Sequence, residues 1–367
     1  MLDELKYFKA AENNGFDPMH DILEGVAHQI LKLVLRCFTK QKKYFQIELF
    51  NKCLGKFDYG CIESRDKPNQ NFTVKKLAEK GNKFKQTAAQ TWVLLRVFPF
   101  IVYDCGHIPE GDPHMKLIIL LQVITYLAFS NILNDEMVEK MKESVHDLQK
   151  TFKQCFPTVT PINKFHHLSH YSYNVKITSV TNGFSCMRFE AMNKLPKGQM
   201  RNGQNYQNVP FSLAKRQNLK QVAAVINRNY YQRVDIITEK IVPRNEMPHA
   251  NLLQLFPSRV CLVKRLKIDG VHFRENVAIK YDDNLRNTKS FAQIRFIYYV
   301  DEKFYFVAEH LNMVCFDEKY NSYRLEKNDE IILIPEENVY KRKTYNLWVI
   351  GGSKNVFISP QYYDEFK

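Results

Sequence analysis

Two pairs of potential metal ligands, far apart in the chain, constrain how this sequence can fold. Asp17 and His20 are three residues apart, and His166 and His170 are four apart. Residues at these spacings share one face of a helix, so each pair can reach a single ion. Zn²⁺ takes four N, S or O ligands, often as two close pairs separated by a long insert. A shared ion would bring the two pairs together and make the sequence between them an insertion.

Each pair also has a simpler interpretation. Asp17 precedes Pro18, as an N-cap residue does before a helix whose first residue is proline, and His20 is then a surface residue. The histidines of residues 166–170 can form a basic or hydrogen-bonding face. Glu190, twenty residues after that cluster, is by itself an ordinary exposed glutamate. Only the combination of these pieces favours a metal site.

Composition and charge narrow the class of protein. The 367 residues carry a formal charge of +14, and 13 Lys and Arg against 4 Asp and Glu within residues 161–250 account for +9 of it. A basic excess of this kind favours a polyanionic partner, with nucleic acid first, over a generic basic surface. Eight scattered cysteines without a Cys-x-x-Cys pair indicate reduced thiols inside a cell. The most apolar run, residues 117–129, is too short to span a bilayer.

Hydrophobic periodicity divides the chain into a helical part and a β-rich part. Apolar residues recur at helical spacing through most of residues 22–157, which predicts an all-helical domain of about five helices. Short runs rich in β-branched and aromatic residues follow within residues 258–367 and predict a small antiparallel barrel or sandwich. The segment 247–257 is the predicted linker. The fold class is therefore α+β, with more than one domain.

Four segments, in this linear order, resemble the CACTA (En/Spm) group of DDE/D transposases. They are Asp17–Gly25, Lys164–Tyr171, Met187–Ala191 and Asn208–Gln217, and the resemblance covers most of residues 15–225. It implies an RNase H-like core interrupted by a helical insertion domain and pinned at the junction by a structural zinc. On this basis residues 1–21 are a remnant of the core, residues 22–157 are the insertion, and residues 158–250 are the helical, basic end of the core. The implied zinc ligands are Asp17, His20, His166 and His170, and Glu190 is the implied third acid of the catalytic triad.

The sequence departs from the family pattern at the catalytic residues. Transposases of this type need two aspartates before the Asp-x-x-His element, and Asp3 is the sole aspartate there, without the strand context expected. Met192 and Asn193 replace the Lys-His that usually follows Glu-Ala. Glu190 alone cannot hold a two-metal centre, so Mg²⁺ or Mn²⁺ is expected only if the catalytic site is complete. We therefore expect a truncated or domesticated relative that is not an active enzyme by itself.

The leading prediction is a nuclear, transposase-derived DNA-binding protein without a membrane segment, with a second copy of the chain as a further candidate partner. Basic residues would contact phosphates without sequence preference. These are Lys164, Arg188, Lys194, Lys197, Arg201, Lys215, Arg216 and Lys220. One alternative is an active transposase or nuclease whose first two acids lie upstream or on a partner. Another is a non-catalytic protein or chromatin interaction module, in which aromatic residues of the β-rich part bind a peptide; those are Tyr298, Tyr299, Phe304 and Tyr305.

Overall fold

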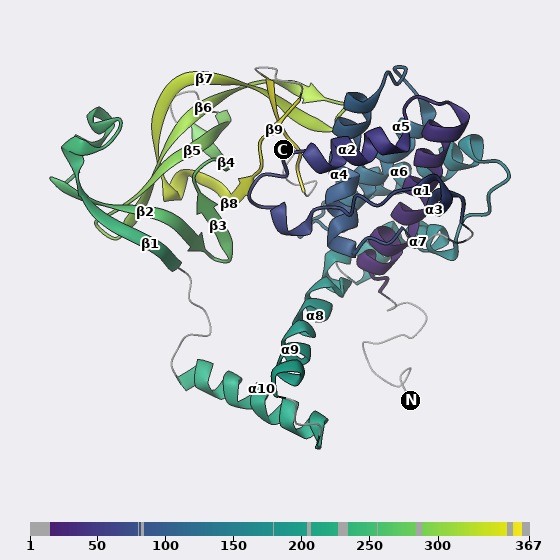
Figure 1. Cartoon of the computed structure of the whole chain (residues 1–367). Coiled ribbons are helices and arrows are strands. Elements are labelled where there is room, and N and C mark those ends of the chain that lie inside the picture. Colours follow the sequence, from purple (N-terminus) through teal and green to yellow (C-terminus); the bar gives the residue numbers. More distant parts are fainter. Residues whose placement is uncertain are drawn as a thin grey trace.

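A computed structural model describes most of the chain (Figure 1). The described residues are 15–79, 81, 84–178, 180–203, 207–226, 234–254, 256–283, 288–350 and 355–361. Asp3 lies outside them. Within these ranges no helix combines the length and the apolar character that crossing a bilayer requires.

The N-terminal part is helical, as the sequence predicts. Its elements are η2 (Met19–Val26), α1 (Ala27–Arg36), η3 (Cys37–Gln41), α2 (Ile47–Lys56), η4 (Ser64–Asp66), α3 (Val74–Ala78), α4 (Ala88–Cys105), α5 (Pro113–Ala128), α6 (Asp135–Cys155) and α7 (Asn163–Ile177). The first three follow one another without a break and include π-helical turns at both ends. Their apolar sides form one continuous core, in which most aliphatic and aromatic side chains are fully buried.

Local sequence signals set several of these helix ends. Thr87 accepts a hydrogen bond from the backbone N–H of Gln90, and the Gln90 side chain accepts one from the Thr87 N–H, which is a capping box at the start of α4. Asp112 caps α5 and Pro113 occupies its first turn, where a missing N–H costs nothing. These caps explain why α4 and α5, two largely buried helices, begin where they do.

A helical arm, residues 187–226, leaves this body (Figure 1). It consists of α8 (Met187–Met192), α9 (Lys194–Gly203) and α10 (Val209–Ile226). A short 3₁₀ turn, η5 (Thr181–Phe184), precedes α8. Helix α9 continues through Pro196 and Gly198. A proline in the first turn of a helix removes no hydrogen bond, so this start is tolerated.

The C-terminal part is one open antiparallel sheet. Its strands are β1 (Val234–Pro243), β2 (Arg259–Ile268), β3 (Val271–Arg274), β4 (Ala278–Asp283), β5 (Thr288–Val300), β6 (Lys303–Asp317), β7 (Ser322–Pro335), β8 (Val339–Tyr345), β9 (Trp348–Val349) and β10 (Asn355–Ile358). Short 3₁₀ turns interrupt them: η7 (Arg244–Glu246), η8 (Ala250–Leu253) and η9 (Glu336–Asn338). The main path is β1-β2-β5-β6-β7-β10-β9, while β3 pairs with β2 and β4 pairs with both β5 and β8.

Two predictions about this part need correction. The described strands form a single open sheet, not a closed barrel or a sandwich of two sheets. The sheet also begins before residue 258, because β1 pairs along its length with β2 and lies inside the segment predicted as the helical end of a core. Of the four aromatic residues considered for peptide binding, Tyr298 and Phe304 are buried, which leaves Tyr299 and Tyr305 partly exposed.

The C-terminal strands pack on the helical part. Trp348 and Phe357 belong to the helical core. Asn346 donates a hydrogen bond to the Tyr59 carbonyl over 2.9 Å, and Asn321 donates one to Gln122 over 3.0 Å. Helical and β-rich parts therefore share a buried interface.

Candidate functional site

Three segments of the chain meet at one junction, and the first lies more than a hundred residues before the other two. They are the start of η2, the first half of α7, and the turn that leads into α8. Lys164 on α7 donates a hydrogen bond to the His20 carbonyl over 2.5 Å. The Cys186 backbone N–H donates one to Asp17 Oδ1 over 3.2 Å. Three of the four segments that carry the resemblance, 17–25, 164–171 and 187–191, therefore meet here, because the first contacts each of the other two.

A buried carboxylate holds α7 against η2. Asp21 Oδ1 lies 3.0 Å from His167 Nδ1, and Asp21 Oδ2 accepts a hydrogen bond from the Tyr171 hydroxyl over 3.2 Å. Burial, followed by the nearby charge of Asp21, raises the pKa of Tyr171 well above its usual value, so this phenol stays a donor. Phe16 stacks on the His167 ring at 4.8 Å. The middle histidine of the cluster is thus a packing and hydrogen-bonding residue of the junction.

Asp17, His20 and Cys186 form a potential metal-binding group at the edge of this junction. Their ligand atoms all lie within 4.8 Å of one another, and all three residues are partly exposed. His20 Nδ1 is 2.5 Å from Asp17 Oδ2, and His20 Nε2 is 3.3 Å from Glu190 Oε1. The hydrogen bond to Asp17 and then burial raise the pKa of the Cys186 thiol. In this state the thiol is a donor to the Asp17 carboxylate.

His166 and His170 form a separate pair on α7. Their Nε2 atoms are 3.0 Å apart. Two imidazole nitrogens bound to one tetrahedral zinc at ~2.0–2.1 Å would be about 3.4 Å apart, so the pair is close to a chelating arrangement. A shared proton between the two rings explains the same distance. His170 also stacks on Phe16, with the ring centroids 5.9 Å apart.

The predicted four-ligand set is therefore divided. The structure brings Asp17 and His20 together, and brings His166 and His170 together, but within the described residues the only group of three or more metal-binding side chains is Asp17, His20 and Cys186. Binding of zinc stays a prediction. Sequence reasoning missed Cys186, although its position one helical turn before Glu190 was a usable signal.

Most of the predicted DNA-contacting residues lie on the arm. Arg188, Lys197, Arg201, Lys215, Arg216 and Lys220 belong to α8–α10, and all of them are at the surface. Lys194 lies on α9, but its side chain is outside the described part of the structure. Lys164 is held at the junction by its hydrogen bond to His20. Six of the eight predicted contact residues are therefore exposed on the arm, and DNA binding by them stays a prediction.

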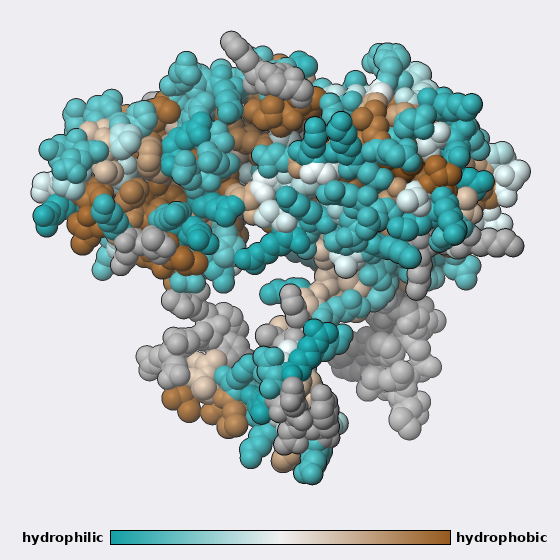
Figure 2. All heavy atoms as spheres, viewed as in Figure 1, coloured by the Kyte–Doolittle hydropathy of each residue, from teal (hydrophilic) through white to brown (hydrophobic). Residues whose placement is uncertain are grey.

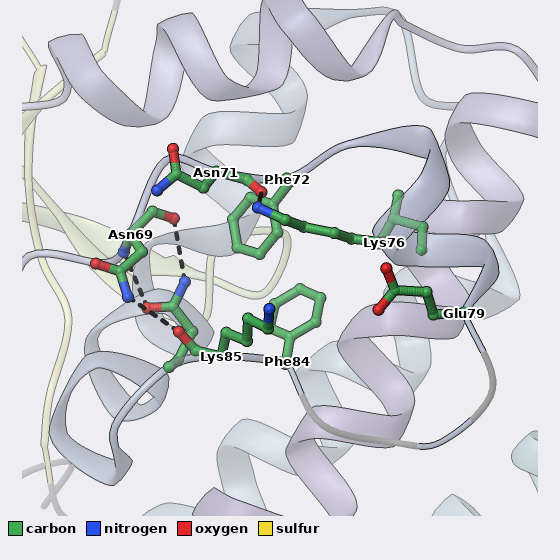
Figure 3. A pocket seen from close by; sticks show the side chains of 9 residues that line it. Asn69, Asn71, Phe72, Lys76, Glu79, Phe84 and Lys85 are labelled. Carbon is green, nitrogen blue, oxygen red and sulfur yellow. Dashed lines mark hydrogen bonds between the residues drawn. The ribbon is translucent and has the colours of Figure 1, made fainter.

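A pocket of about 220 Å³ lies elsewhere, beside α3 (Figure 3). Phe72 and Phe84 stack on each other at 4.6 Å at its floor, with Asn69 on one side and Glu79 on the other. The Lys76 ammonium is hydrogen-bonded to the Asn71 carbonyl. Typical small-molecule sites enclose at least ~300 Å³, so this pocket is smaller than such sites. This pocket carries no functional assignment.

Comparison with known proteins adds no relative to these observations: no family model, no curated protein and no solved structure matches the chain.

Proposed function

We propose that this protein is a transposase-derived DNA-binding protein, a remnant of a DDE/D strand-transfer enzyme that does not cut DNA by itself. The supporting observation is the junction. Residues 17–25, 164–171 and 187–191 resemble motifs that meet in such enzymes, and here the first segment contacts both of the others across more than a hundred residues of sequence. An accidental motif match would not require the segments to be neighbours in space.

The helical arm supplies the DNA-contacting surface in this proposal. Residues 187–226 carry 7 Lys and Arg and a single acid, Glu190. The arm extends away from the helical body (Figure 1). Contacts from Lys and Arg to phosphates supply affinity without sequence preference, and they release condensed counterions. Binding should therefore weaken steeply as salt rises.

A zinc ion at the junction would stabilise the contact between η2 and the helices that lead into the arm. Asp17, His20, His166 and His170 are its predicted ligands. Metal binding would then be part of the folding free energy of the junction, and a chelator would loosen the base of the arm. Glu190 lies beside this site and faces His20. In this proposal the glutamate keeps the position that it had in the ancestral enzyme, without a complete catalytic centre around it.

The decisive experiment is a salt titration of DNA binding. Fluorescence anisotropy with a labelled duplex of arbitrary sequence would compare the wild type with the triple variant Lys215→Ala, Arg216→Ala, Lys220→Ala. Each lost phosphate contact lowers the slope of log K against log salt by about 0.9, so the triple variant should lose up to about 2.7. The matched control replaces three exposed lysines of the body, Lys116, Lys140 and Lys150, which gives the same change in charge.

Equal losses in both triple variants would show a generic charge effect and would refute the arm as the binding surface. No binding by the wild type at low salt would refute the DNA-binding function itself. Glu190→Gln serves as a separate check. With Zn²⁺ in excess it should leave DNA binding unchanged, whereas an active transposase would lose strand transfer completely.

A protein partner is the second candidate, and the surface of α10 favours it. Five apolar side chains of this helix are more than half exposed: Phe211, Leu219, Val222, Val225 and Ile226. Hydrophobic atoms are accordingly visible on the outer part of the arm (Figure 2). Soluble monomers rarely leave such a patch uncovered. If a second copy covers it, light scattering should give a dimer mass for the wild type and a monomer mass for Leu219→Glu with Val222→Glu.

A further inference from the structure

We propose that Asp17, His20 and Cys186 bind one thiophilic divalent cation, Zn²⁺ in the natural protein, and that Glu190 orients His20 from outside the ligand shell. This inference rests on the metal-stabilised junction of the proposed function, and it changes the residues that hold the metal. Cys186 replaces the histidine pair of α7 as the partner of Asp17 and His20.

The backbone positions one oxygen of Asp17 for this role. Asp17 Oδ1 accepts hydrogen bonds from the backbone N–H groups of Met19 over 2.9 Å and Cys186 over 3.2 Å. Both donors fix the carboxylate, so that Oδ2 faces His20 Nδ1. Because the Cys186 N–H bond ties residue 17 to residue 186, it also brings the thiol to this carboxylate. Three different ligand types therefore converge from two segments 169 residues apart.

The second nitrogen of His20 identifies the role of Glu190. Nδ1 is on the side of Asp17 and Nε2 is 3.3 Å from Glu190 Oε1. A histidine that binds a metal through one nitrogen commonly donates its other N–H to a carboxylate, which fixes the tautomer and the ring orientation. With Nδ1 on the metal, Nε2–H donates to Glu190. This glutamate is not part of the three-residue ligand group.

The histidine pair of α7 lies outside this ligand shell. Ligands of one tetrahedral zinc, at ~2.0–2.3 Å from the ion, must lie within about 4 Å of one another. Within the described residues, Cys186 joins Asp17 and His20 in a group whose ligand atoms all lie within 4.8 Å of one another, and neither His166 nor His170 does. Their Nε2 atoms point toward each other instead.

The chemistry of the ligands selects the cation. A thiolate with an imidazole and a carboxylate suits Zn²⁺, whereas Mg²⁺ prefers an all-oxygen shell. Binding replaces the hydrogen bond from the Cys186 thiol to Asp17 with a sulfur–metal bond, and the thiol proton passes to solvent. The site is thus distinct in chemistry from a two-magnesium transposase centre.

Cobalt substitution of the full chain tests this assignment. Co²⁺ bound to a thiolate gives a sulfur-to-metal charge-transfer absorption that oxygen and nitrogen ligands do not produce. The wild type should bind one Co²⁺ per chain with this absorption, and Zn²⁺ should displace it. Cys186→Ser should lose the absorption, while Cys315→Ser, a partly exposed cysteine on β6, should keep it. His170→Ala should also keep it.

Glu190→Gln supplies a second readout that separates an orienting residue from a ligand. The absorption should remain, and the affinity for Co²⁺ should fall by about 10- to 100-fold, as for other groups that orient a ligand. Folded wild type that binds no Co²⁺, or a thiolate absorption that survives Cys186→Ser, would overturn the proposal. If His170→Ala abolishes the metal and Cys186→Ser does not, the four-ligand site is correct and this assignment is wrong. DNA binding by the arm is measured in a separate experiment, so the metal assignment can fail while the DNA-binding proposal holds, and the reverse.

Discussion

The side chain of Lys164 lies directly over the α-carbon of Gly25. A Cβ at residue 25 would be 2.3 Å from Lys164 Cδ and 3.0 Å from the His20 carbonyl oxygen. Lys164 then reaches past this point to donate its hydrogen bond to the same carbonyl. The glycine therefore allows α7 to approach η2 closely enough for the junction to form.

Gly25→Ala should destabilise the protein. The added methyl group forces Lys164 to move, and overpacking of this kind typically costs about 1–3 kcal/mol, which exceeds the ~0.5–1 kcal/mol that alanine contributes in a helix. Urea denaturation followed by circular dichroism measures the difference. Gly198→Ala is the matched control, because that helical glycine has no atom within 4 Å of an added Cβ. The close-contact argument fails if the two variants are equally stable.

Tyr171→Phe should weaken the same junction by removing one hydrogen bond to a charged acceptor. Tyr171 is fully buried and donates to Asp21, which is itself 5% exposed. Bonds to charged groups contribute about 1.5–3 kcal/mol, and the variant leaves a buried carboxylate with one partner fewer. Tyr173→Phe, on the same helix but 54% exposed, should change the free energy of unfolding by less than about 0.5 kcal/mol. A similar small effect at residue 171 would mean that its hydroxyl contributes little.

Much of the helical part could be predicted from periodicity, because the periodic stripe is also the buried face. Met137, Met141, Val145 and Leu148 recur at helical spacing, and all four are buried on α6. Strand β1 was not predicted from the sequence. Its conformation depends on its pairing with β2, which is a non-local contact. Alternation along a strand likewise predicts a strand but not whether the sheet closes.

The sequence predicts which segments meet at the candidate site, but not which of their side chains face one another. Motif spacing indicates that residues 17–20 and 164–171 should meet, and the structure has them in contact. Which histidine turns toward η2 depends on the rotation of α7, which is set by burial of Phe165 and Leu168. That rotation directs His167 to Asp21 and leaves the pair around it at the surface. The rotation of α7 about its own axis cannot be predicted from a single sequence.

Stability should fall as the pH is lowered from 6.5 toward 4, and His28 should account for part of the loss. Burial and then the positive charge of Lys164 lower the pKa of His28 to about 4. The Thr91 hydroxyl donates to the Thr87 carbonyl, so it accepts from His28 Nε2–H over 3.0 Å, which fits a neutral imidazole. Unfolded His28 takes up a proton below pH 6.5 while folded His28 does not, so protons favour the unfolded chain.

The size of this effect follows from the two pKa values. A separation between 6.5 and about 4 corresponds to about 3 kcal/mol, present above pH 6.5 and lost by pH 4. His28→Gln should flatten the pH dependence of the free energy of unfolding by up to that amount. His107→Gln, at an exposed position, should leave the wild-type curve unchanged. Parallel curves for wild type and His28→Gln would show that His28 is protonated in the folded protein.

Arg96 should be a main contributor to the contact between the helical part and the sheet. It is 4% exposed, pairs with the buried Glu63, and donates to the Ser359 carbonyl over 2.7 Å. Its guanidinium also lies 5.1 Å from the Trp348 ring. Arg96→Met removes these contacts and leaves a buried carboxylate without its ion pair, which typically costs about 3–5 kcal/mol. Adding Glu63→Gln removes the stranded charge, so the double variant should recover part of the lost stability. If the double variant is no more stable than Arg96→Met, the loss comes from the contacts to Ser359 and Trp348 and not from the unpaired charge.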